Sequence, residues 1–160
     1  MKKVFKFMMM ALAAVVLTVG FAACSSDDEE DKPVNPKQTE SYLDLNLTFT
    51  DDILAVFDVT VTYTDATGSD KTETVTNKEF SKKITYSKAP STIAYSVKVV
   101  KKTTIPAQDS YKIGCTTKTT LCKNGKGVLH STSVNTQTSA SKLDTYINRV
   151  NGTDILGKSI

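Results

Sequence analysis

Apolar and polar residues alternate along much of the chain beyond residue 41. The alternation is clearest in residues 42–49, YLDLNLTF, where Leu or Phe occupies every second position. A period of two is typical of strands with one face against a core and the other in water. Comparable runs predict further strands at 53–64, 71–76, 80–86, 92–102 and 110–123. The chain is therefore expected to fold mainly as β-structure.

The run at 53–64 follows Asp51 and Asp52, which interrupt the alternation. Leu54 and Val56 make its start apolar on both faces, so we expect the beginning of this strand to be covered on both sides. Adjacent carboxylates could serve as an acid and a base, but neighbouring residues at a strand end point in opposite directions. Asp51 and Asp52 are therefore predicted to form a turn.

Two turns are marked by glycine. The segment DATGSD at 65–70 has Gly68, which is free to adopt a positive φ. Asn124-Gly125 is the stronger signal, because this dipeptide favours a two-residue hairpin turn. Such a turn pairs residues at equal distances on either side of it. The predicted pairs are Leu121 with Val128, Thr119 with His130, and Cys115 with Val134.

This register separates two of the three cysteines. Cys115 and Cys122 would lie on one strand, roughly 23 Å apart and on opposite faces, because a strand rises about 3.3 Å per residue. A disulfide needs Cα atoms within about 7 Å, so the two could not be bridged. The alternative is a chain that turns within 116–121 and joins them, which an oxidising location would permit.

The last part of the chain changes its period. Ser141 and Asp144 have the spacing of a capping box, and Gly152 has the position of a helix stop. The apolar residues between them follow at helical spacing: Leu143, Tyr146, Ile147 and Val150. We predict one helix at 141–151 and a final strand within 153–160.

About seven strands separated by regular turns predict an all-β domain over residues 41–160. The favoured architecture is an Ig-like antiparallel β-sandwich with one short C-terminal helix. The alternative is a lipocalin-like barrel, which also places a helix after its strands. Such barrels usually carry an early tryptophan, and this sequence has none.

The first 23 residues have the layout of a secretory signal peptide. Lys2, Lys3 and Lys6 precede an uninterrupted run of apolar and small residues from 7 to 23. The run is long enough for a transmembrane anchor, but acids rather than basic residues follow it, which argues against that alternative.

The end of this run, Phe21-Ala22-Ala23-Cys24, resembles a bacterial lipobox, with Phe21 where the motif usually has Leu. The resemblance implies that Cys24 is lipidated and becomes the first residue of the mature protein. A lipobox cysteine carries a diacylglycerol and usually an N-acyl group, and several acyl chains give stable anchoring. The alternative is ordinary cleavage after Ala23, which would leave an unmodified thiol.

A serine-acidic run follows the cysteine. It consists of Ser25, Ser26, Asp27, Asp28, Glu29, Glu30 and Asp31. This run resembles the export signal of Bacteroidetes surface lipoproteins, which implies a protein on the outer membrane of a Gram-negative cell, facing the exterior. The same run is also typical of a solvated acidic spacer. Residues 24–40, with Pro33 and Pro36, are therefore predicted to form a tether between the lipid and the β domain.

The net charge of the chain bears on whether it binds nucleic acid. The net charge of +3 comes from 20 basic and 17 acidic residues, and three of the lysines lie in the predicted signal peptide. Without them the charges balance, so the pI of 8.7 is no evidence for nucleic-acid binding. The expected partners are the membrane, through the lipid on Cys24, and a protein or glycan.

Catalytic chemistry has little support in the sequence. His130 is the single histidine, and the hairpin register makes it a strand residue opposite Thr119. A zinc site would need His130 together with Cys115 and Cys122, which the same register scatters. No catalytic residue, metal or cofactor is therefore predicted, and a hydrolase using His130 remains an alternative.

Glycan binding would need exposed aromatic rings. Tyr63 and Tyr95 fall on predicted core faces, whereas Tyr86 and Tyr111 flank loops and are the candidate ligand contacts. The sequence favours a non-catalytic surface module that binds a partner or serves as an accessory subunit. A small glycan-binding lipoprotein is the second interpretation.

Overall fold

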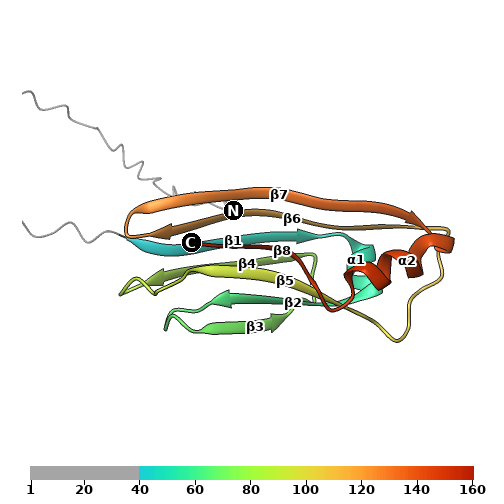
Figure 1. Cartoon of the computed structure of the whole chain (residues 1–160), viewed down its shortest axis with the longest axis horizontal. Helices are drawn as coiled ribbons and strands as arrows, with labels where there is room; N and C mark the ends of the chain where they lie inside the picture. Colours follow the sequence, from blue (N-terminus) through green and yellow to red (C-terminus); the bar gives the residue numbers. More distant parts are fainter. Residues whose placement is uncertain (1–39) are drawn as a thin grey trace, which may run out of the picture. The chain divides into compact units, whose positions relative to one another are not determined.

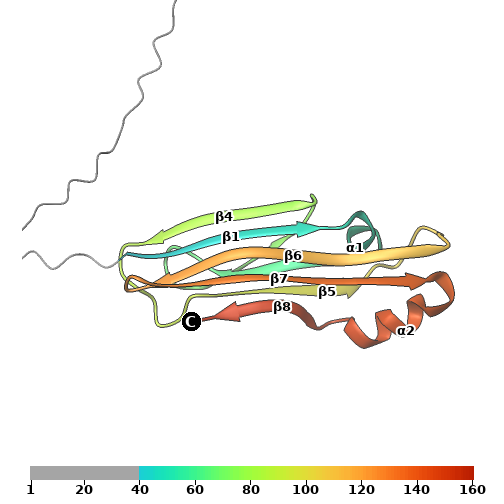
Figure 2. The same cartoon turned by 90° about the horizontal axis from the view of Figure 1, so that it is seen from above.

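The computed structural model describes residues 40–160, which form eight strands and two short helices (Figure 1). The strands are β1 (Ser41–Phe49), β2 (Phe57–Thr64), β3 (Asp70–Thr74), β4 (Glu79–Tyr86), β5 (Ala94–Lys101), β6 (Ser110–Lys123), β7 (Lys126–Ser139) and β8 (Asp154–Ser159). The helices are α1 (Asp51–Val56) and α2 (Ala140–Val150), and both lie at one end of the strands (Figure 2). The predictions for the signal peptide, Cys24 and Ser25–Asp31 concern residues outside this part of the chain.

Two antiparallel four-stranded sheets make up the domain. One has the order β4-β1-β6-β7 and the other β3-β2-β5-β8. The core between them is built from alternate residues of the central strands, such as Leu43, Leu45, Val61 and Val97, all fully buried. The predicted antiparallel β-sandwich with a short C-terminal helix is confirmed. The lipocalin-like alternative is wrong, because the described strands form two separate sheets rather than a closed barrel. The likeness to immunoglobulin domains is one of architecture, because the strand order within the sheets is different.

The segment before β2 differs from the prediction. Residues 51–56 form helix α1 where we expected a turn and the start of a strand. Thr50 caps the helix, accepting a hydrogen bond from the Ile53 N–H at 3.4 Å, and acidic residues occupy its first turn. Ile53 and Val56 lie three positions apart and are both buried. This spacing, rather than a strand covered on both sides, explains why the run is apolar in both alternating positions.

The β6–β7 hairpin follows the predicted register throughout. Asn124 and Gly125 have φ values of 51° and 74°, as a two-residue turn requires. Leu121, Thr119 and Cys115 pair with Val128, His130 and Val134. Cys115 and Cys122 are free and buried, so the bridged alternative is wrong.

Helix α2 and strand β8 confirm the two elements predicted at the end of the chain. The expected capping box is not formed: Ser139 is the N-cap residue and makes no side-chain cap bond, and Ser141 lies one residue inside the helix. Gly152 ends the helix with a φ of 76°, as expected. Leu143, Tyr146 and Ile147 turn one face of α2 toward the core.

Candidate functional site: an open groove between two edge strands

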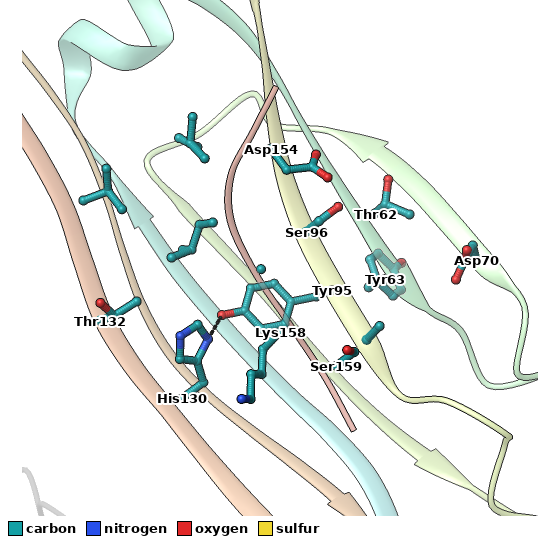
Figure 3. Close-up of a pocket in the computed structure, with 15 residues that line it drawn as sticks. Thr62, Tyr63, Asp70, Tyr95, Ser96, His130, Thr132, Asp154, Lys158 and Ser159 are labelled. Carbon is teal, nitrogen blue, oxygen red and sulfur yellow. Dashed lines mark hydrogen bonds between the residues drawn. The ribbon is translucent and has the colours of Figure 1, made fainter. Parts of the chain in front are cut away.

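A groove lies on one flank of the sandwich. The last strands of the two sheets, β7 and β8, border a groove of about 670 Å³, which we call the β7–β8 groove (Figure 3). Its lining includes the hydroxyl groups of Thr62, Ser96, Thr132 and Ser159, the carboxylates of Asp70 and Asp154, and the amine of Lys158. The groove runs along β8, because all six residues of that strand line it, together with His130, Thr132 and Val134 of β7.

A tyrosine–histidine contact lies in this groove. Tyr95 extends from β5, and its hydroxyl is 2.7 Å from Nδ1 of His130 on β7 (Figure 3). The Tyr95 side chain is only 3 % exposed, whereas His130 is half-buried. Burial raises the pKa of the Tyr95 phenol, which therefore stays a protonated hydrogen-bond donor.

The contact continues into the core as a chain of hydroxyl groups. The Tyr95 hydroxyl donates to Oγ1 of Thr117 at 3.0 Å, and that atom lies 2.7 Å from Oγ1 of Thr119. Both threonines are fully buried, and both reach the backbone of Asn46 on β1. This chain links strands of both sheets, and a buried polar chain is tolerated only when its members are hydrogen-bonded.

The arrangement around His130 does not resemble a catalytic triad. A triad needs a histidine hydrogen-bonded to the nucleophile and oriented by a third group. Here the hydrogen-bond partner of His130 is the phenol of Tyr95, and within residues 40–160 the structure shows no bond from His130 to a serine or a carboxylate. In the same range, no three His, Cys, Asp or Glu side chains are close enough to hold a metal ion.

The two tyrosines predicted as ligand contacts are not available to a sugar. Tyr86 and Tyr111 are 5 % and 4 % exposed. Each hydroxyl is used internally: Tyr86 donates to the carbonyl of Thr64 at 2.8 Å, and Tyr111 to the carbonyl of Pro106 at 2.7 Å. Both rings lie on the inward-facing side of their strands, so neither offers a face for stacking, and this prediction is wrong.

The sequence did indicate that Tyr63 and Tyr95 belong to the core, and both are buried. It did not single out Thr117 and Thr119, which look like surface strand residues. The signal that could have found them is the alternation of the strand: Thr117 and Thr119 are odd-numbered, like Cys115 and Leu121, and therefore lie on the same buried face of β6. The hairpin register then places His130 directly across from Thr119.

Comparison with protein-family models, with curated proteins and with solved structures finds no match for this chain. Neither helix in the part of the chain that the structure describes is long and apolar enough to cross a membrane.

Proposed function

We propose that this chain is a non-catalytic binding or accessory module, displayed on the outer membrane by lipid on Cys24, with the β7–β8 groove as its binding site. The observation that carries the proposal is the groove itself, an open hollow in which hydrogen-bonding side chains gather. Binding sites typically combine a concave surface with a few convergent polar groups. The single histidine supports a binding role, since it is tied to a buried hydroxyl chain rather than to a nucleophile.

The lining suits a polar ligand that both donates and accepts hydrogen bonds. Asp154 and Lys158 supply opposite charges on β8, and Thr132 and Ser159 supply hydroxyl groups from the two edges. Apolar side chains, among them Val134, complete the surface. A segment of a protein partner fits this mixture best. A glycan is the weaker candidate, because Tyr63 and Tyr95 are buried and leave no aromatic platform.

Binding is tested by capturing partners from outer-membrane extract with the purified chain, beside a glycan array. The variant Lys158→Ala removes a charged donor from the groove, and Lys118→Ala removes an exposed lysine on β6, outside the groove lining. We expect Lys158→Ala to weaken binding about tenfold or more, since hydrogen bonds to charged groups contribute about 1.5–3 kcal/mol. Equal binding by both variants would count against the groove as the site.

The anchor is tested separately. Cells grown with labelled palmitate should label the chain, and Cys24→Ala should abolish the label. Protease added to intact cells should remove the β domain if the chain faces the exterior. A labelled chain that resists the protease would instead be a lipoprotein facing the periplasm.

A further inference from the structure

The four edge strands of the sandwich are protected to very different degrees. Edge strands commonly avoid pairing with other chains by being short or by carrying charges and prolines. Strands β3 and β8 have 5 and 6 residues and contain charges, and β4 carries Glu79, Lys82 and Lys83. Strand β7 has 14 residues, and from Gly127 to Ser139 it contains no Lys, Arg, Asp, Glu or Pro. It is the one long and uncharged edge among the described strands.

The hairpin register shows which backbone groups of β7 are unpaired. The residues that flank a two-residue turn, Lys123 and Lys126, exchange hydrogen bonds, and the bonding then alternates along the strand. The even-numbered residues of β7 therefore bond to β6, and the odd-numbered ones point their N–H and C=O groups outward. The outward set is Gly127, Leu129, Ser131, Ser133, Asn135 and Gln137. Within residues 40–160 no other strand pairs with this edge.

We propose that β7 pairs antiparallel with β7 of a second copy of this chain, about a two-fold axis at Ser133. This register sets Ser131 opposite Asn135 of the second copy and Leu129 opposite Gln137 of the second copy. It joins 13 residues of each strand, 127–139, and matches outward backbone groups with outward backbone groups. The β4-β1-β6-β7 sheet of one copy and the same sheet of the second copy then form one sheet of eight strands.

A second copy fits this edge because the strand is complementary to itself. No two like charges face each other anywhere in the paired segment, and hydroxyl and amide side chains meet across the axis. Leu129, 60 % exposed, also gains cover from the neighbouring strand. The same operation on β4 would bring Lys82 and Lys83 of one copy against those of the other, which opposes pairing.

The pairing also ends at two copies. After β7 is used, the joined sheet has β4 at both ends, and β4 carries charges that discourage further addition. An isologous contact of this kind closes on itself rather than forming a filament. The contact uses backbone groups of β7 and does not depend on the ligand proposed for the β7–β8 groove.

Cysteine scanning of the full chain in its membrane tests the register. The two described native cysteines, Cys115 and Cys122, are buried, and Ser133 is exposed. Residues that face each other across a hydrogen-bonded antiparallel pair lie about 5.5 Å apart at Cα, which suits a disulfide. Under a mild oxidant such as diamide, Ser133→Cys should give a disulfide-linked dimer. Ser81→Cys, the same change on edge strand β4, should not.

A mixture makes the test stricter. Alone, neither Ser131→Cys nor Asn135→Cys should form a disulfide-linked dimer, and cells that make both variants should yield the disulfide-linked mixed dimer. As a second measurement, Ser133→Lys sets like charges across the axis and should return the purified chain to monomer in sedimentation while leaving its circular dichroism unchanged. The proposal is overturned if Ser133→Cys forms no disulfide-linked dimer, or if Ser131→Cys or Asn135→Cys forms one alone.

Discussion

The two flanks of this sandwich are built in opposite ways. At the flank formed by β3 and β4, which we call the bridged flank, Glu73 binds Lys82 at 2.7 Å and Lys71 at 3.1 Å and accepts a hydrogen bond from the Tyr63 hydroxyl. The Tyr63 and Phe80 rings pack beneath this cluster, 6.3 Å apart. At the β7–β8 flank no ion pair joins the two edge strands among the described residues.

The size of the hollows follows this difference. The bridged flank keeps a hollow of about 300 Å³, and the β7–β8 groove measures about 670 Å³. Side chains that bridge two sheets satisfy each other and leave few groups for a ligand. The open flank keeps the hydroxyl groups of Thr132 and Ser159, the carboxylate of Asp154 and the amine of Lys158, and beside them lies a free strand edge. We infer that side chains close the bridged flank, whereas the β7–β8 flank leaves a groove that a ligand could enter.

The largest expected effect is on the buried chain beneath the groove. Tyr95→Phe removes the hydroxyl that joins Thr117 to His130 and leaves a buried threonine with one partner fewer. We expect a loss of about 1–3 kcal/mol in the free energy of unfolding, measured by urea denaturation. Tyr42→Phe, on a half-buried side chain in β1, is the control. An unchanged stability for Tyr95→Phe would mean that the hydroxyl chain contributes nothing.

His130→Ala should have a smaller effect. Tyr95 keeps its bond to Thr117, so the loss should be about 0.5–1.5 kcal/mol in the free energy of unfolding. The same variant tests the hydrolase alternative, because a non-catalytic binding module has no hydrolysis activity for His130→Ala to remove. An ester or peptide hydrolysis activity that disappears specifically in His130→Ala would contradict the non-catalytic proposal.

On the bridged flank, Glu73→Gln keeps the shape of the side chain and removes its charge. We expect a loss below about 1 kcal/mol in the free energy of unfolding, since ion pairs open to solvent contribute little. Adding salt should reduce the difference between Glu73→Gln and the parent chain, because salt screens the ion pairs. A loss larger than that of Tyr95→Phe would mean that these solvent-exposed ion pairs contribute more to the free energy of unfolding than the buried hydroxyl chain does.

Acid should act on the bridged flank in a defined window. The hydrogen bond from Lys82, followed by that from Tyr63, lowers the pKa of Glu73 from its ordinary value of 4.5 to about 2. A group with a lowered folded-state pKa stabilises the fold above its unfolded value, and this contribution is lost as the pH falls toward the folded value. The stability difference between the parent chain and Glu73→Gln should therefore shrink below pH 4.5. A difference that is constant with pH would contradict this assignment.

The sequence predicted what local patterns determine. Strand β1 was readable from strict alternation, and the β6–β7 register from Asn124-Gly125, because a two-residue turn fixes every later pair. Helix α1 was missed because Thr50 and the acids after it act as a cap and a first turn, while the same acids also resemble a strand break. In six residues, the periods of a helix and a strand cannot be separated.

The groove could not be predicted in the same way. It depends on β7 and β8, strands of different sheets that become neighbours only when the sheets pack. Tyr86 and Tyr111 were misassigned for a related reason. Positions next to loops suggest exposure, but the alternation of their strands turns both rings inward.

The comparison of the two flanks is tested most directly by photo-crosslinking in intact cells. A photoreactive phenylalanine at Ser159, which lines the β7–β8 groove, is compared with one at Ser81 on the bridged flank. Our account predicts an adduct with a ligand or partner from Ser159 and none from Ser81. The mass of this adduct should differ from twice the mass of the chain, which distinguishes a bound partner from a crosslinked second copy. An adduct formed equally from both positions, or from Ser81 alone, would contradict the account.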